Sequence, residues 1–342
     1  MVDIVTFGEV LLRLKSPGYE RFFQSPQFEA TFGGAEANVA NSLSHFGLNV
    51  AHVTALPDND IAQAAVCDLR RYGVDTRFIN YQGKRIGTYY LEAGASLRPG
   101  RVIYDRAHSS LSEAQIDDFN WDKILAGAKW FHTSGITPAI SHSAAGITLD
   151  AMKTARKMGL TVSLDLNYRA NLWQYGKTAT EVMPELAKHA DIIIAGREDC
   201  QQCLGVNVDL KAKEDISELD HFKALSSEMM YSFPGLKMLA ITLRQSIRAD
   251  YHRWSACLTE RDKFRNTEIY DIHNIIDRVG GGDSFSAALI YGLHKNHSKQ
   301  DALDFATAAG ALKHSVPGDI NLVTEKEVRS LMKGTSGGRV QR

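Results

Sequence analysis

The sequence has little that would direct the chain to a membrane, to nucleic acid or to an oxidising compartment. Its 39 lysines and arginines are balanced by 40 aspartates and glutamates, which leaves a formal net charge of −1 at pH 7. Nucleic-acid and membrane-surface proteins need a basic footprint, so this balance argues against both classes of partner. No apolar run approaches the roughly 18 residues that suggest a membrane-spanning helix. We therefore expect a cytoplasmic protein with neither nucleic-acid nor membrane partners.

Cysteines and targeting signals are also scarce. The N-terminal stretch MVDIVTFGEVLLRL lacks a basic segment followed by a long apolar one, so it predicts a first strand and not a signal peptide. Four cysteines in 342 residues, without a secretion signal, suggest reduced thiols. Cys200 and Cys203 form a C-x-x-C, but no second pair or histidine cluster accompanies it. We predict that this pair is simply part of a helix.

Two common nucleotide-binding signatures are missing. The sequence has no G-x-x-x-x-G-K-[ST] motif at its glycine cluster, which argues against a P-loop there. The fingerprint G-x-G-x-x-G should follow the first strand of its unit, but TFGEVLL has only one glycine. An NAD-linked dehydrogenase is therefore disfavoured.

What is present is an alternation of strand and helix patterns, which predicts an α/β fold with a mostly parallel sheet covered on both faces. Apolar residues at helical spacing followed by glycine mark helices at 35–47 and 60–73. The remaining expected strands are 3–9, 49–56, 129–135, 160–167, 191–196 and 236–243, and the remaining helices are 141–159 and 178–190.

Two stretches interrupt the alternation. Residues 10–32 and 86–106 resemble strands with no helices between them. We interpret them as a small β-sheet inserted into the α/β domain, in a position to act as a lid. The expected organisation is one domain over residues 1–334 and a flexible tail at 335–342, which is polar and rich in glycine.

The most informative stretch is IIDRVGGGDSFSAALIYGL at 275–293. Gly280, Gly281 and Gly282 precede a good helix pattern, so their amides and the helix N-terminus together predict an anion hole for a transferring phosphoryl group. Asp283 follows directly and could accept a proton from an attacking hydroxyl, which describes a kinase for an alcohol. A carboxylate at a helix N-terminus should have a lowered pKa. The alternative is a structural glycine loop in which Asp283 only caps the helix.

A second glycine motif lies near the other end, in TFGGAEANVANSLSHFGLNV. Gly33 and Gly34 precede a helix whose first turn carries Asn38. Small residues allow a ligand to approach the backbone, and an asparagine amide can bind two sugar hydroxyls.

Together the two motifs resemble the signatures of the ribokinase-like (PfkB) sugar kinase family. G-G-x-x-x-N-x-A stands at 33–40 and D-x-x-G-x-G-D at 277–283. The resemblance implies a three-layer ribokinase-like domain with a central sheet and a β-sheet lid, acting with ATP and Mg²⁺. It implies Asp283 as base, Gly280–Gly282 as anion hole, and a homo-oligomer of two or more subunits.

Other segments are similar to the 2-keto-3-deoxygluconate kinase branch, namely VIYDR, GITPAIS, SLDLNYRANLW and KHSVPGD. The resemblance implies phosphorylation of the terminal hydroxyl of a 2-keto-3-deoxy sugar acid. The substrate contacts that it implies, besides Asp283, are Gly34, Asn38, Tyr89, Tyr104, Arg106, Arg169 and Asp319. A sugar acid needs a cation for its carboxylate, for which Arg106 and Arg169 are the candidates. The alternative for each is an ordinary surface ion pair.

The nucleotide side departs from the family pattern. Where many members have N-x-x-E, this chain has Gly196 and, at the acidic position, Asp199; Glu198 and Asp199 remain candidates for orienting Mg²⁺-bound water. No dedicated metal cage is expected, because Mg²⁺ is held mostly by substrate phosphates. Where many members have the loop T-x-G-x-x-G, the sequence reads TLRQSIR, with Thr242 kept and Arg244 at a glycine position. Arg244 could approach the ATP phosphates or point to solvent.

The adenine pocket has the weakest pattern. The resemblance makes Asp277 a cofactor-side residue and suggests four candidates for the adenine pocket, namely Ala308, Ala309, Lys313 and Asn321. The alanines could equally be helix packing. Two rivals for the function stay open: a kinase of the same fold for a neutral sugar such as fructose or ribose, and a non-catalytic sugar-binding sensor.

Overall fold

The computed structural model describes residues 2–208, 217–261 and 263–334, so the predicted tail at 335–342 lies outside the described residues. The strands are β1 Ile4–Phe7, β2 Leu11–Lys15, β3 Glu29–Gly33, β4 Val50–Leu56, β5 Ile79–Tyr81, β6 Gly87–Glu92, β7 Arg101–Asp105, β8 Trp130–Ser134, β9 Thr161–Asp165, β10 Ile192–Gly196, β11 Met238–Arg248, β12 Tyr251–Glu260, β13 Lys263–Asn266 and β14 Tyr270–His273.

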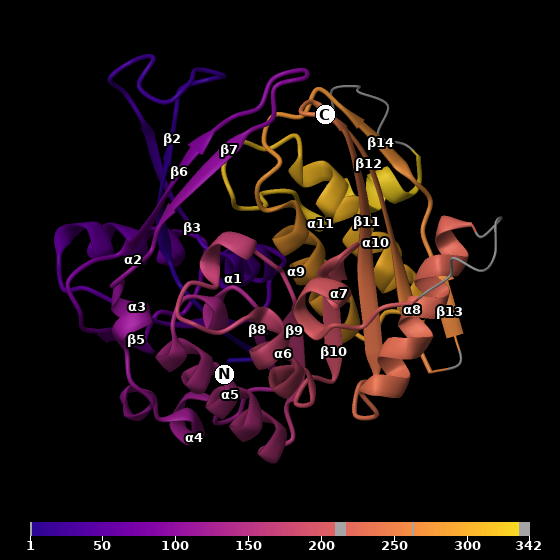
Figure 1. Ribbon diagram of the computed structural model, residues 1–342, viewed down its shortest axis with the longest axis horizontal. Helices are drawn as coiled ribbons and strands as arrows, with labels where there is room; N and C mark the ends of the chain where they lie inside the picture. The colour runs from indigo at the N-terminus through magenta and orange to yellow at the C-terminus, as the bar shows by residue number, and fades with distance from the viewer. Residues whose placement is uncertain (1, 209–216, 262, 335–342) are drawn as a thin grey trace.

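The helices begin with α1 and end with α11 (Figure 1). They are α1 Ala35–His45, α2 Asp60–Arg71, α3 Ser110–Glu113, α4 Trp121–Ile124, α5 His142–Lys157, α6 Ala179–Ala187, α7 Asp199–Leu204, α8 Glu218–Ser232, α9 Gly281–His294, α10 Lys299–Lys313 and α11 Glu325–Met332, with short 3₁₀ turns at Ile116–Asp118, Thr137–Ala139 and Ala170–Leu172. No helix of the described ranges is long and apolar enough to cross a membrane.

A central sheet organises the molecule. Within the described residues its order is β13-β12-β11-β10-β9-β8-β1-β4-β5, with β14 also paired to β12. The pairs from β5 to β11 are parallel. Such strands are buried on both faces and read as apolar runs, as IIIAG in β10 does.

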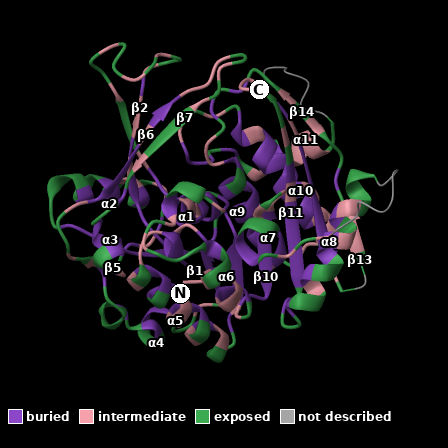
Figure 2. Cartoon of the chain, in the orientation of Figure 1, coloured by how far each residue is buried: buried purple, intermediate pink, exposed green. Residues whose placement is uncertain are grey.

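Alternate residues of each strand face opposite layers of helices. Ile192 and Ile194 pack into a core with α1, α2, α9, α10 and α11. Ile193 and Ala195 pack into a second core with α3 to α8. Figure 2 shows the buried strands between these layers of partly exposed helices. The predicted α/β fold with a mostly parallel, doubly covered sheet is confirmed.

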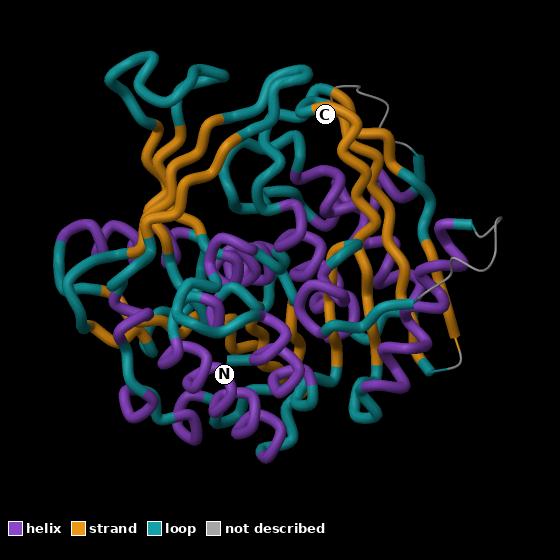
Figure 3. Tube along the Cα trace, in the orientation of Figure 1, coloured by secondary structure: helices purple, strands orange, loops and turns teal. Residues whose placement is uncertain are grey.

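The two interruptions form a separate sheet of order β3-β2-β6-β7, which Figure 3 shows standing away from the helical layers. Pairing within this small sheet is antiparallel except for β2 and β6. Three of its residues, Leu11, Tyr89 and Leu91, form a core of their own. The predicted inserted sheet is therefore present, with its strands inside 10–32 and 86–106 except that β3 ends one residue later, at Gly33.

The segment TLRQSIR, which stands where many family members have a nucleotide-binding loop, is a strand in this structure. These residues continue β11 as far as Arg248, and β11 pairs with β12 in a long antiparallel hairpin. The sequence predicted a strand only over 236–243, because side chains after Leu243 are mostly exposed and the apolar pattern stops there. Strands β12, β13 and β14 were missed altogether.

Candidate active site

A cavity of about 730 Å³ opens where the carboxyl ends of the parallel strands meet the small sheet. This is the edge at which open α/β sheets place their ligands. The lining includes Leu11, Gly34, Asn38, Tyr89, Tyr104, Arg106, Asp165, Asn167, Arg169, Gly196, Glu198, Asp199, Thr242, Arg244, Arg278, Gly280, Gly281, Gly282, Asp283 and Asp319. Both glycine motifs, far apart in the chain, therefore border one space.

The glycine run begins helix α9, as predicted. Gly280 is the N-cap residue and has φ 79°, which favours glycine. A Cβ at this position would lie 2.0 Å from the backbone oxygen of Asp319. A Cβ at Gly282 would have no atom within 4 Å, so this residue faces open space. The loop thus keeps its backbone accessible at the helix N-terminus, as an anion site requires.

These two glycines should respond differently to alanine. Gly280→Ala is expected to destabilise the fold by about 1–3 kcal/mol from backbone strain alone, with the clash added. Gly282→Ala is the matched control and should be neutral or up to about 1 kcal/mol stabilising, because it lies in the first turn of α9. Urea unfolding of both variants measures the difference. Equal stabilities would show that the loop does not have this backbone conformation.

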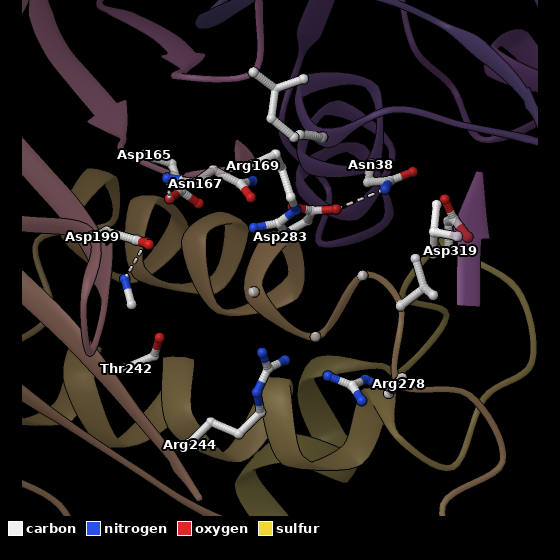
Figure 4. A pocket seen from close by; sticks show the side chains of 18 of the residues that line it. Asn38, Asp165, Asn167, Arg169, Asp199, Thr242, Arg244, Arg278, Asp283 and Asp319 are labelled. Carbon is white, nitrogen blue, oxygen red and sulfur yellow. Dashed lines mark hydrogen bonds between the residues drawn. The ribbon is translucent and has the colours of Figure 1, made fainter. Parts of the chain in front are cut away.

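Gly34 and Asn38 connect the first motif to the second. Gly34 has φ 139°, and a Cβ there would lie 2.1 Å from the backbone oxygen of Glu9, so only glycine fits. It caps α1 and places Asn38 in the opening turns of that helix. Asn38 Nδ2 donates a hydrogen bond to Oδ2 of Asp283 at 2.7 Å, as Figure 4 shows. This contact joins residues 245 positions apart.

The environment of Asp283 overturns the expectation of a lowered pKa. The pKa of this carboxyl is raised to about 7, chiefly by burial and to a smaller extent by the nearby carboxylates of Asp319 and Glu36. The hydrogen bond from Asn38 and the positive charge of Arg169 oppose this rise. Burial dominates because it penalises the ionised form more than these partners favour it. A carboxyl with a pKa near 7 is well matched to general-base work.

Asp165, at the end of β9, is a lining residue that sequence reasoning missed. Its Oδ2 accepts a hydrogen bond from Ser286 Oγ at 2.9 Å and its Oδ1 accepts one from the Asn167 amide. Burial raises its pKa to about 8, and Asp283 and Asp199 add to the rise. Its position at the carboxyl end of a buried strand, where open α/β sheets place their ligands, could have identified Asp165 from the sequence.

The predicted magnesium-side residues Glu198 and Asp199 both line the cavity. Asp199 Oδ2 accepts a hydrogen bond from the amide of Gly196 at 2.6 Å, and burial raises the pKa of Asp199. Glu198 is exposed. No group of three or more metal-ligating side chains gathers in the described part of the chain. Such a sparse arrangement fits Mg²⁺, which takes one or two carboxylates and otherwise water and phosphate oxygens.

A buried ionic cluster involves three of the predicted residues. Arg13 of β2 bridges Asp277 and Asp319, and its side chain is 2% exposed. Tyr89 Oη donates to Asp319 at 2.5 Å. Asp277 also accepts hydrogen bonds from the amides of Val279 and Gly318. The cluster thus links β2 and β6 of the small sheet to the segments that carry Asp277 and Asp319. Arg13 was not among the predicted residues.

The two arginines predicted to bind the substrate carboxylate differ in their surroundings. Arg106 is buried and paired through Nε and Nη2 with Glu9 at 2.6 Å, so its charge is already compensated. Arg169 is exposed in the cavity, and among the described residues its guanidinium donates, through Nη1, only to the backbone oxygen of Tyr168. Figure 4 shows the Arg169 side chain extending toward Asp283. Tyr104 lines the same cavity beside Arg106.

Thr242 and Arg244, which were predicted to contact the nucleotide, line the cavity from β11. Thr242 Oγ1 donates to the backbone oxygen of Ala195 at 3.3 Å. Arg278, which stands two positions before Gly280, lines the same wall and was missed. Its position as a basic residue next to a glycine-rich, phosphate-type loop could have identified Arg278 from the sequence.

Two of the residues suggested for the adenine pocket, Ala309 and Asn321, are buried. Ala309 is completely buried in α10 and belongs to the core beneath the sheet. Asn321 is 1% exposed and accepts a hydrogen bond from the amide of Val323. Neither is among the lining residues, so the alternative of packing describes Ala309 better.

Comparison with known proteins agrees with the family resemblance that the two glycine motifs indicated. Residues 1–227 and 255–326 match the model of the pfkB family carbohydrate kinases. A 2-dehydro-3-deoxygalactonokinase of Haloferax volcanii is 31% identical over 336 residues, which are 98% of each chain. A 2-dehydro-3-deoxygluconokinase of Bacillus subtilis is 26% identical over 97% of this chain and 95% of its own.

A solved structure shows the same similarity in three dimensions. The crystal structure of 2-dehydro-3-deoxygluconokinase from Thermotoga maritima has a TM-score of 0.91 and 44% sequence identity, covering 98% of this chain and 100% of that one. The shared arrangement therefore extends over the whole domain, the small sheet included.

Proposed function

Since the chain belongs to the pfkB family of carbohydrate kinases, we propose that it transfers the terminal phosphoryl group of ATP to the terminal hydroxyl of 2-keto-3-deoxygluconate. The observation that carries the proposal is the pairing of Asp283 with the glycine run at the start of α9. The family places the protein among sugar kinases. The names of its relatives suggest the substrate class.

Asp283 acts as the base in this proposal. Its carboxylate, oriented by the Asn38 amide, accepts the proton of the substrate hydroxyl as that oxygen attacks phosphorus. The amides of Gly280, Gly281 and Gly282 face the oxygens of the transferring group, where the N-terminus of α9 favours negative charge. Positioning and electrostatics are the main contributions that a protein makes to phosphoryl transfer.

Mg²⁺, when bound with ATP, neutralises charge on the phosphate oxygens. Asp199 and Glu198 are the residues that would hold the water around it. Their small number agrees with the preference of this ion for water and phosphate ligands.

Arg169 binds the carboxylate of the sugar acid. Its guanidinium has no carboxylate hydrogen-bond partner among the described residues, whereas Arg106 is already paired with Glu9. A guanidinium matches a carboxylate with two parallel hydrogen bonds. The substrate would then extend from Asp283, at the reacting hydroxyl, to Arg169 at its acidic end.

ADP release measured with a panel of 2-keto-3-deoxygluconate, 2-keto-3-deoxygalactonate, fructose and ribose tests this assignment. The acids should be phosphorylated in preference to the neutral sugars. Arg169→Ala should lower kcat/KM for the acids by about 10–100-fold, the usual worth of a hydrogen bond to a charged group. Rates with any neutral sugar should change little. Measurement at pH 9 keeps Asp283 ionised after the neighbouring cation is removed.

Arg101→Ala provides the control, because Arg101 is an exposed arginine on β7. It should leave all rates unchanged. Preferential turnover of fructose or ribose would favour the neutral-sugar kinase instead. Sugar binding without any ADP release would favour the non-catalytic sensor.

A further inference from the structure

Two further arginines line the cavity, Arg244 and Arg278, and the charges of Asp199 and Asp277 offset theirs only in part. Arg244 comes from the exposed half of β11, and Arg278 comes from the segment before the glycine run. In the described part of the chain, neither guanidinium has a hydrogen-bond or ion-pair partner. Figure 4 shows both side chains directed into the same space beside the start of α9. Most other arginines near the site are paired, as Arg13 and Arg106 are.

This arrangement is unfavourable without a ligand. Partial burial lowers the pKa of Arg244 to about 10, and the charges of Arg278 and Arg169 contribute to the lowering. Burial and Arg169 also lower the pKa of Arg278. Like charges held close together in a cavity repel each other, so the protein would be more stable without one of them. A bound anion removes this repulsion.

The ligand must carry more than one negative charge. Arg169 lies on the sugar side, next to Asp283, while Arg244 and Arg278 lie with Thr242 on the nucleotide side. A chain of phosphates has the required charge, and guanidinium groups match phosphate oxygens in pairs. In addition, Ala309 and Asn321, two of the positions suggested for the adenine pocket, are buried and are not among the lining residues.

We propose that Arg244 and Arg278 form a two-guanidinium clamp for the phosphate chain of the donor, and that the phosphates, not the base, provide most of its binding affinity. The clamp rests on the proposed kinase function and specifies how its donor is recognised. Arg244 stands in β11 where a strand replaces a glycine loop, so side-chain donors take over from backbone amides. Donor nucleotides with different bases should then be used at similar rates.

Titration calorimetry with the native protein, without sugar, tests the clamp. ADP and inorganic tripolyphosphate should bind within about tenfold of each other, because both present phosphoanhydride chains. AMP and adenosine should bind at least about 100-fold more weakly, since removing a single charge-assisted hydrogen bond weakens binding by roughly tenfold or more. Equal affinity for adenosine and ADP would overturn the proposal.

The variants Arg244→Gln and Arg278→Gln should each weaken ADP binding by about 10–100-fold. Lysine at either position should restore part of the affinity. The ligand-free glutamine variants should unfold at the same temperature as the native protein or a higher one, whereas a structural arginine would give a lower one. Arg248→Gln, on the same strand but paired with Asp250, should leave ADP binding unchanged. Normal ADP binding by both glutamine variants would refute the clamp.

The sugar panel separates this proposal from the proposed function. If the glutamine variants lose ADP affinity but no sugar is phosphorylated by the native protein, the clamp stands and the kinase assignment fails. If a sugar acid is phosphorylated while both variants keep the native KM for ATP, the kinase assignment stands and the clamp fails.

Discussion

Asp283→Asn is expected to lower kcat by about 10²–10⁴-fold, the usual contribution of a positioned general base. The asparagine Oδ1 can still accept the hydrogen bond from Asn38, so the geometry of the site should be kept. Sugar affinity, measured by calorimetry without ATP, should remain within a few-fold of the native value. Turnover within tenfold of the native rate would contradict the role of Asp283 as base.

The pH dependence gives a second check on the same residue. The base must be ionised to act, and its pKa is raised to about 7, so native kcat/KM should fall about tenfold per pH unit below 7. With a base of ordinary aspartate pKa, the fall in kcat/KM would begin only near pH 4. Asp304→Asn is the matched control, because burial also raises the pKa of Asp304 but this residue lies on α10, outside the cavity lining. The control variant should keep the native rate, and its kcat/KM should still begin to fall near pH 7.

The raised pKa also has a consequence for stability. A carboxyl whose folded pKa lies above its unfolded one binds more protons when folded, so stability falls as pH rises from about 4 to about 7. Above pH 7 the ionised carboxylate is buried at a cost. Asp283→Asn removes that charge and should therefore unfold at a higher temperature than the native protein at pH 8. Together with the loss of turnover, this would mark a residue kept for activity at the expense of stability.

Arg13→Met is expected to destabilise the fold by about 3–5 kcal/mol. The substitution fills a similar volume but leaves the carboxylates of Asp277 and Asp319 without their shared cation. Removing one partner of a buried ionic cluster is costly because the remaining charge is desolvated and unpaired. Urea unfolding at pH 8 measures the effect as a lower midpoint at an unchanged slope.

A surface pair supplies the control for this measurement. Lys177 and Glu181 form an exposed pair one helical turn apart, and Lys177→Met should change stability by less than about 0.5 kcal/mol. If Arg13→Met is no more destabilising than the control, the two carboxylates are not ionised and buried as the structure has them. A loss of stability would also explain lower activity, because the cluster holds the segments on either side of the glycine run.

Much of the architecture could be predicted from local pattern. Helix α2 was expected at 60–73 and spans Asp60–Arg71, and the small sheet was expected from two interruptions of the strand and helix rhythm. The far half of β11 and strands β12 to β14 were missed. The far half of β11 and alternate residues of β14 are exposed, so pairing with β12, not an apolar period, makes them strands. Strand β12 itself is mostly buried, but its apolar residues are mixed with polar ones and no helix follows it, so it broke the expected alternation.

Some residues of the candidate site were also identified from the sequence, whereas others were not. Gly280 and Gly34 were identified because glycine motifs are visible in a sequence, and the structure adds that both have a positive φ, which favours glycine. Asp165 and Arg278 were missed, although Asp165 lies at the end of a predicted strand and Arg278 is next to the glycine motif. Only the folded sheet brings Asp165 within reach of Ser286, 121 positions away.

Residue type and short-range spacing were enough for the alternation of elements, the two glycine motifs and the family that they resemble. Charge state and pairing were decided by tertiary structure alone. The helix N-terminus predicted a lowered pKa for Asp283, but burial among distant carboxylates raises it. Arg106 is neutralised by Glu9, whereas Arg244 has no such partner in the described chain. Desolvation and Coulomb interactions depend on distance in space, and separation along the chain does not reveal that distance.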